Sequence, residues 1–179
     1  MPRAAPLIVF VGGAPGAGKT TLAVALAAAL GLPLVAKDAI KEPLMDILGA
    51  PDIEASRRIG RATYAVLFAL AGAAVSAGSG VVVESNFHRE RSAEALVELA
   101  ARGRAVFVHC VVPDALRRAR YATRARHPGH FDRALLAAWD DDVSIFEPPD
   151  RAGIERIDVD TSGPVDVGAL ARCVAAGTT

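Results

Sequence analysis

The sequence is poor in cysteine and contains no closely spaced cysteine pair. Its two cysteines, Cys110 and Cys173, lie far apart in the chain. A disulfide framework and a zinc site built from paired thiolates are therefore not expected. Cys110 lies in an apolar run and Cys173 in a helical pattern, which favours two buried thiols in a reducing compartment.

Long apolar runs and an excess of one charge are also absent. The apolar run at 7–11 is much shorter than the roughly 20 residues that span a bilayer, and glycines rather than a cleavage site follow it. The 20 basic side chains are balanced by 20 acidic ones, so bulk charge does not favour a polyanionic partner. We expect a cytoplasmic protein with no membrane partner, in which any anion site is local.

Lysine is scarce, repeats are absent, and no low-complexity linker divides the chain. The three lysines are Lys19, Lys37 and Lys41, so arginine supplies the positive charge elsewhere. A chain of 179 residues can bury one full hydrophobic core. We therefore expect residues 1–179 to form a single domain.

Short apolar runs alternate with stretches of helical spacing. The candidate strands are 7–11, 32–36, 81–83, 106–112 and 154–159. The candidate helices are 19–30, 54–77, 89–102, 114–124, 133–145 and 165–175. The strand runs are continuously apolar rather than alternating, which suits strands that are covered on both faces. The pattern predicts a three-layer α/β fold with a five-stranded parallel sheet.

A glycine-rich motif links the first candidate strand to the first candidate helix, and it fits the P-loop pattern G-x-x-x-x-G-K-[ST]. Its glycines let the backbone point N–H groups at phosphate oxygens, and the start of the helix adds positive charge. The dinucleotide pattern G-x-G-x-x-G is not present. The expected nucleotide-binding residues are Gly13, Ala14, Pro15, Gly16, Ala17, Gly18, Lys19, Thr20 and Thr21.

The last residues of this motif are expected to contact the phosphates and the metal ion. Lys19 is expected to reach the β- and γ-phosphates of ATP, and Thr20 offers its hydroxyl to Mg²⁺. ATP and Mg²⁺ are therefore the expected cofactors. A glycine-rich turn without a nucleotide is the structural alternative.

Acidic residues follow the second and third candidate strands, where the carboxyl ends of a parallel sheet face the P-loop. Asp38 is placed to accept the proton of an acceptor hydroxyl, or else to cap the helix that begins there. Glu84 is placed to bind Mg²⁺ through water or to fix the acceptor, or else to act as a structural acid at a strand end. Asn86 and His88 follow it and are candidates for the acceptor side.

Six arginines lie between Arg117 and Arg133, and this segment is the candidate lid. The spacing of Arg117, Arg120 and Arg124 predicts one helical face that leads into a mobile loop at 125–132. Arginine can bridge phosphate oxygens, so a closing lid of this kind would stabilise the moving phosphoryl group. A solvated basic face and a nucleic-acid patch are the alternatives.

Four segments together resemble the zeta-toxin-like and AAA-type P-loop kinases: G-A-P-G-A-G-K-T, K-D-A-I-K-E, V-V-V-E-S-N-F and R-Y-A-T-R-A-R-H-P-G-H. The resemblance implies a P-loop kinase fold with Asp38 as the catalytic base. It also implies that Lys19 acts on the phosphates and that Arg120 and Arg124 act in the lid. The segment 159–164 resembles the loop that packs on adenine. Glu84 stands where many members have aspartate.

The sequence predicts a kinase that transfers the γ-phosphate of ATP to a hydroxyl of a small-molecule acceptor. The candidate helix 54–77 is expected to form a wall of the acceptor pocket, with side chains Arg57, Arg58, Arg61 and Tyr64. A 5′-hydroxyl nucleic-acid kinase and a switch ATPase without an acceptor are the alternatives. The guanine-recognition pattern N-K-x-D is absent, which disfavours a GTPase.

Overall fold

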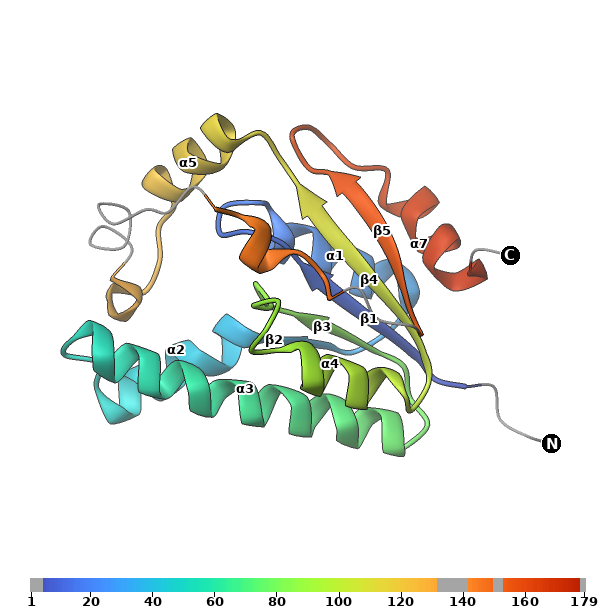
Figure 1. The fold of residues 1–179 in the computed structure, drawn as a ribbon, viewed down its shortest axis with the longest axis horizontal. Coiled ribbons are helices and arrows are strands. Elements are labelled where there is room, and N and C mark those ends of the chain that lie inside the picture. Colours follow the sequence, from blue (N-terminus) through green and yellow to red (C-terminus); the bar gives the residue numbers. More distant parts are fainter. Residues whose placement is uncertain (1–4, 132–141, 150–152, 178–179) are drawn as a thin grey trace.

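Five parallel strands form a single sheet in the computed structural model, which describes residues 5–131, 142–149 and 153–177 (Figure 1). The sheet order is β2-β3-β1-β4-β5. The strands are β1 (Leu7–Gly12), β2 (Leu34–Ala36), β3 (Val81–Glu84), β4 (Arg104–Val111) and β5 (Ile154–Asp160). The predicted five-stranded parallel sheet is confirmed.

Strand β1 lies at the centre of the sheet and divides its side chains between two cores. Ile8 and Phe10 enter one core, and Val9 and Val11 enter the other, as the alternation of a strand requires. Strands β3 and β4 pair with β1 on its two sides. Because β1 is buried on both faces, its apolar run is continuous, which is why the sequence identified it.

Helices cover both faces of the sheet. Helices α1 (Lys19–Leu30) and α7 (Val167–Ala176) pack on one face, and α3 (Ile53–Ser76) and α4 (Ala93–Ala100) pack on the other (Figure 1). Leu26 of α1 and Leu67 of α3 are both fully buried in these two cores. The predicted three-layer architecture is confirmed.

Helix α2 (Lys37–Leu48) follows β2 directly and was not among the predicted helices. Pro43 lies inside it and disfavours a helix, because proline removes a backbone donor. The helix packs alongside α3, and its residues Lys41 and Met45 are buried. Tertiary packing therefore overrides local propensity here, and it brings residues 37–48 to the edge of the P-loop crevice.

Helix α3 passes the length and hydropathy test for a membrane-spanning helix. The core helix of a globular domain can pass the same test. Leu67, Ala71 and Val75 of α3 are buried in the core beneath the sheet. The packing of α3 is that of a core helix.

The C-terminal half differs from prediction in three places. Helix α5 (Asp114–Thr123) is followed by a three-ten turn, η1 (Pro128–His130), where a loop was expected. The predicted helix 133–145 lies mostly outside the described residues, and its described end enters a second three-ten turn, η2 (Ser144–Phe146). The expectation of two buried thiols is half wrong, because Cys110 is buried but Cys173 is exposed.

Candidate functional site

The P-loop joins β1 to α1 and depends on glycine backbone conformations. Gly13 and Gly16 have φ angles of 132° and 87°, which disfavour other residues. A Cβ atom at Gly13 would lie 2.6 Å from the carbonyl oxygen of Cys110. One at Gly16 would lie 2.5 Å from that of Arg117. These close approaches let the loop fold over the carboxyl end of β4 and the start of α5.

Lys19, the first residue of α1, lies inside this loop with only 9% of its surface exposed. Its ammonium donates to the carbonyl oxygen of Ala14 at 2.9 Å. Burial lowers the pKa of Lys19, and the nearby carboxylate of Glu84 opposes that shift. An anionic group in the loop would further favour the charged form of Lys19.

A cavity of about 210 Å³ opens beside Lys19 at the carboxyl edge of the sheet. Residues from the P-loop, from α2 and α3, from the end of β3 and from residues 121–131 all reach it. Its lining residues are Pro15, Lys19, Thr20, Lys37, Asp38, Lys41, Ile53, Ser56, Arg57, Glu84, Ser85, Asn86, Tyr121, Arg124, Arg126, His130 and Phe131. The structure thus brings together the predicted site residues Lys19, Thr20, Asp38, Glu84 and Arg124.

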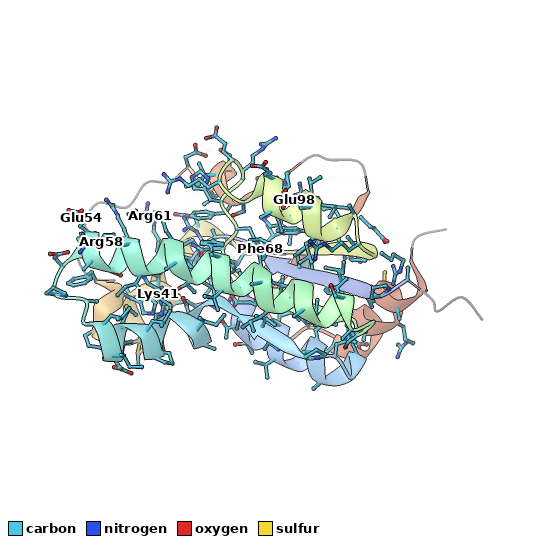
Figure 2. The ribbon with its side chains drawn as sticks, turned by 90° about the horizontal axis from the view of Figure 1, so that it is seen from below. Lys41, Glu54, Arg58, Arg61, Phe68 and Glu98 are labelled. Atoms are coloured by element: carbon cyan, nitrogen blue, oxygen red, sulfur yellow. The ribbon has the colours of Figure 1, made fainter. Side chains whose placement is uncertain are left out.

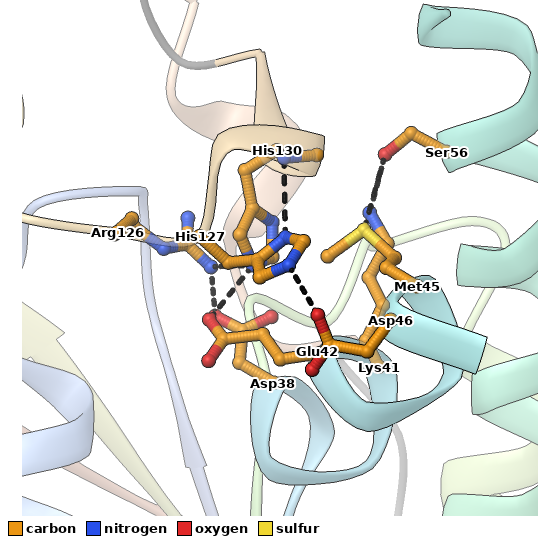
Figure 3. Close-up of polar contacts among 10 residues, drawn as sticks. Asp38, Lys41, Glu42, Met45, Asp46, Ser56, Arg126, His127 and His130 are labelled. Carbon is orange, nitrogen blue, oxygen red and sulfur yellow. Dashed lines mark hydrogen bonds and ion pairs between the residues drawn. The ribbon is translucent and has the colours of Figure 1, made fainter. Parts of the chain in front are cut away.

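Asp38 lies in the first turn of α2 and does not cap it. Ala36 occupies the N-cap position, and no side-chain capping bond forms there. The capping interpretation of Asp38 is therefore wrong. Its carboxylate is half-buried and pairs with the guanidinium of Arg126 (Figure 3).

The charge state of Asp38 depends on its neighbours. Burial acts to raise the pKa of Asp38, but the guanidinium of Arg126 and further positive charges outweigh it. The pKa of Asp38 consequently lies below its usual value. The carboxylate is ionised at neutral pH, as a proton acceptor must be.

Glu84 ends β3 and is 4% exposed. Burial raises the pKa of Glu84, and the ammonium of Lys19 counteracts that effect only in part. With the hydroxyl of Thr20 and the carboxylate of Asp38, Glu84 presents hard oxygen ligands to the same cavity. Mg²⁺ prefers such ligands and keeps several waters and phosphate oxygens, so this set of residues fits Mg²⁺.

The segment 126–130 is docked on α2 by three side-chain contacts (Figure 3). Besides the Arg126 pair with Asp38, His130 Nε2 lies 2.9 Å from Glu42 Oε1. His127 Nε2 lies 2.9 Å from Asp46 Oδ1. Three acids spaced one helical turn apart on α2 thus face this segment. They provide anionic partners where an open, mobile loop was expected.

The arginines of the predicted lid do not share one environment. Arg117 is buried and pairs with Asp114, and Arg118 pairs with the same carboxylate. Arg124 follows the end of α5, stacks on the ring of Tyr121 and lines the cavity. Arg133 lies outside the described residues.

Arg120 points to a second cavity, of about 440 Å³, on the other side of the P-loop. Its guanidinium donates to the carbonyl oxygens of Thr161 and Ser162 at 3.0 and 3.1 Å. The hydroxyl of Thr161 donates to the carbonyl oxygen of Ala17 at 2.7 Å, which ties the loop after β5 to the P-loop. Thr21 also lines this cavity. Arg120 and Arg124 therefore do not meet in one cavity.

The expected wall on α3 is only partly present. Arg57 lines the first cavity, whereas the neighbouring Arg58 pairs with Glu54 at 3.0 Å on the exposed side of α3 (Figure 2). Arg61 is exposed and Tyr64 bonds through its hydroxyl to Ser85 at 2.9 Å, and neither lines the cavity.

Two residues after β3 were also candidates for the acceptor side. Asn86 lines the first cavity. His88 does not line it, and its ring contacts Phe146 instead.

Sequence reasoning missed several members of the cavity. Arg126 was placed in the lid segment but was not singled out, although it is the arginine that contacts Asp38. Lys37 and Lys41 belong to no phosphate-binding motif. The available signal is that all three lysines of the chain fall within residues 19–41, and all three line this one cavity.

A family model described as an AAA domain matches residues 7–149. A candidate kinase from Chloroflexus aurantiacus is 32% identical over 98% of this chain and 100% of its own, with a TM-score of 0.83. A sugar kinase from Janibacter is 21% identical over 97% and 99% of the two chains, with a TM-score of 0.61.

The APS kinase CysC of Mycobacterium tuberculosis, solved in complex with AMPPNP and APS, is 18% identical over 97% of both chains, with a TM-score of 0.59. These last two likenesses concern the fold. Among curated proteins, no match is found. On the family match across most of the chain, together with the P-loop and the cavity beside it, the protein belongs to the AAA domain family and is an AAA-type P-loop kinase.

Proposed function

We propose that this kinase transfers the γ-phosphate of ATP to a hydroxyl group of a small-molecule acceptor. The observation that carries the proposal is the meeting of Lys19, Asp38 and Glu84 with Arg124 and Arg126 in one cavity. A cradle for phosphates, a carboxylate for the acceptor and arginines for the moving charge are what phosphoryl transfer needs.

In the proposed reaction the acceptor oxygen attacks the γ-phosphorus. A bond forms between these atoms, the bond from γ-phosphorus to the bridging oxygen breaks, and ADP leaves. Lys19 neutralises charge on the β- and γ-phosphates. Asp38 accepts the hydroxyl proton, which its low pKa allows because the carboxylate is ionised before attack. Arg124 and Arg126 stabilise charge on the transferred group.

Mg²⁺, when bound, would neutralise negative charge on the phosphates. The residues that would hold it are Thr20, through its hydroxyl, and Glu84, through water. The raised pKa of Glu84 fits such a role, because a divalent cation would favour the ionised form that burial now disfavours.

The second cavity is the proposed site of the adenine ring. It lies beside Gly18 and Thr21 of the P-loop, and Arg120 and residues 161–167 form its other walls. This placement agrees with the resemblance of the segment 159–164 to an adenine-packing loop. AMPPNP bound to the APS kinase of the same fold supports ATP as the phosphate donor.

A panel of hydroxyl compounds tests the proposal. Aminoglycosides, amphenicols, sugars, sugar acids, nucleosides and short oligonucleotides are each scored for ADP release above the rate with ATP alone. Stimulation by a small molecule, with phosphate recovered on it, is the expected result. Stimulation by 5′-hydroxyl oligonucleotides alone would indicate a nucleic-acid kinase. Full ATP turnover without any acceptor would indicate a switch ATPase.

A further inference from the structure

The first cavity holds more positive charge than a nucleotide requires. Among residues 5–131, 142–149 and 153–177, two carboxylates line it, whereas its cationic side chains are Lys19, Lys37, Lys41, Arg57, Arg124 and Arg126. The P-loop lysine and the two arginines of residues 124–126 account for the phosphates in the proposed reaction. The other three cations lie on α2 and α3.

Lys41 is the most enclosed of these three cations. It is 8% exposed, and its ammonium crosses from α2 to α3, where it donates to the hydroxyl of Ser56 at 2.9 Å (Figures 2 and 3). Its terminal atoms also approach Gly60, one turn further along α3. The ammonium is thus held in place at one wall of the cavity.

Arg57 adjoins Ser56 and also lines the cavity. It is exposed, and no ion pair involving it is found among residues 5–131, 142–149 and 153–177. Its neighbour Arg58 differs, because Glu54 neutralises it one turn away. The two adjacent arginines of α3 therefore differ: Arg58 pairs with Glu54 at the surface, whereas Arg57 lines the cavity.

Lys37 completes the group at the start of α2. Its ammonium lies 4.7 Å from the centroid of the Tyr64 ring, and Tyr64 is in turn bonded to Ser85. A cation–π contact of this kind positions the side chain without cancelling its charge. The ammonium therefore remains available to a ligand on the Asp38 side of the cavity.

We propose that Arg57 and Lys37 form an anion subsite beside Lys41, so that the acceptor is a compact hydroxy compound that carries a carboxylate or a phosphate group. The proposal rests on the kinase function proposed above and specifies its substrate class. A cavity of about 210 Å³ suits a compact acceptor. The positive region does not continue along α2, where Glu42 and Asp46 face residues 127–130, and this disfavours a nucleic-acid strand as the ligand.

Matched pairs of acceptors test the subsite in the full-length protein with ATP and Mg²⁺. Gluconate is compared with glucitol, glycerate with glycerol, and glucose 6-phosphate with glucose. A 5′-hydroxyl oligonucleotide is tested beside them as a polyanionic acceptor. Binding is measured separately, as the thermal shift that each compound produces in the presence of AMPPNP and Mg²⁺. We expect the charged member of at least one pair to bind and react at least about tenfold better, as loss of a charged contact predicts.

Variants of α3 then test whether Arg57 is responsible for the preference for charged acceptors. Arg57→Gln is expected to raise the KM for the charged acceptor about tenfold or more, with little change in kcat or in affinity for AMPPNP. Arg57→Lys restores much of that loss, and Arg58→Gln is the matched control that changes nothing. Equal binding of charged and neutral members in every pair, or equal effects of Arg57→Gln and Arg58→Gln, overturns the subsite. Stimulation by the oligonucleotide alone overturns it as well.

The subsite and the kinase function fail in different ways. Transfer to neutral acceptors at undiminished rate keeps the kinase and removes the subsite. Anion binding that depends on Arg57, without phosphate transfer to any hydroxyl compound, keeps the subsite and removes the proposed reaction. Thermal shift and product analysis on the same preparations distinguish these outcomes.

Discussion

Arg126 and Asp38 form an ion pair that joins the segment after α5 to the first turn of α2. The same arginine also lies 3.0 Å from His130 Nε2, so it connects the proposed base to the residues that dock this segment (Figure 3). If ATP binds as proposed, its γ-phosphate would compete with Asp38 for Arg126. The ion pair would then open as the nucleotide binds, which would leave the carboxylate of Asp38 to the acceptor.

Arg126→Gln is expected to move the acidic limb of the pH dependence of kcat/KM to higher pH. Burial acts to raise the pKa of Asp38, and Arg126 is the largest influence that lowers it. Without Arg126 the pKa of Asp38 rises, so the carboxylate is protonated at a pH where the wild-type carboxylate is still ionised. The measurement is a pH–rate profile of kcat/KM for ATP from about pH 4 upward, because this ratio reports the pKa of the enzyme before ATP opens the ion pair.

Arg118→Gln serves as the control for this profile, because Arg118 pairs with Asp114 on the exposed side of α5. Its acidic limb should coincide with that of the wild type. An Arg126→Gln profile that also coincides with the wild type would show that Asp38 does not set the acidic limb.

Glu84→Gln should raise thermal stability and lower activity. Burial gives Glu84 a raised pKa in the folded state, so the folded protein binds this proton more tightly than the unfolded chain does. Ionising Glu84 therefore costs folding free energy, and the cost grows as pH rises from its ordinary pKa through the raised one. At neutral pH the uncharged glutamine avoids that cost, so the Tm of nucleotide-free protein should be higher in the variant.

The same substitution should raise the Mg²⁺ concentration for half-maximal rate by about tenfold or more, the scale seen when a residue around a bound metal is lost. Glu98→Gln, at an exposed position of α4, provides the control for both measurements (Figure 2). A stability gain without any change in the Mg²⁺ dependence would leave Glu84 a structural acid.

Much of the fold was predictable because its three central strands, β3, β1 and β4, are buried on both faces. The run at 7–11 is continuously apolar and became the central strand β1, between the two cores. Helix α2 was not among the predicted helices because Pro43 interrupts a short pattern. Its existence depends on contact with α3, which no local pattern reveals.

The candidate site was predictable where motif and topology act together. Lys19 belongs to a sequence motif, and Asp38 and Glu84 follow strands whose carboxyl ends meet at one edge of the sheet. The arginines were less predictable. Helical spacing placed Arg120 and Arg124 on one face, but α5 ends at Thr123 and the backbone turns to an extended conformation at Arg124. The two side chains consequently enter different cavities.

Lys19→Ala is expected to reduce ATP turnover by about a hundredfold or more, the scale for loss of a group that stabilises transition-state charge. The fold should persist, because the ammonium contacts a carbonyl of the P-loop rather than apolar core residues. ADP release and far-UV circular dichroism are measured on the same preparation. Normal turnover in a folded variant would contradict the assignment of the P-loop as the phosphate site.

Asp38→Asn separates a catalytic base from a ligand of the metal. If Asp38 accepts the acceptor proton, the amide should lower the rate of phosphoryl transfer by roughly a hundredfold or more, the scale for a positioned general base. Affinity for an ATP analogue should not fall, because Lys19 and the P-loop backbone bind the phosphates and the amide competes less for Arg126. Stability should fall only slightly. Asp38 caps no helix end, and an acid in the first turn of a helix contributes about 0.3–1 kcal/mol.

Asp46→Asn is the matched control, because Asp46 lies two turns further along α2 and contacts His127 rather than the cavity. Transfer rates and dissociation constants for AMPPNP are measured for both variants with Mg²⁺ present. A transfer rate in Asp38→Asn equal to that of Asp46→Asn would rule out the base. A loss of AMPPNP affinity as large as the loss of rate, relieved by added Mg²⁺, would instead place Asp38 in the metal site, since only a metal ligand makes nucleotide binding depend on its charge in this way.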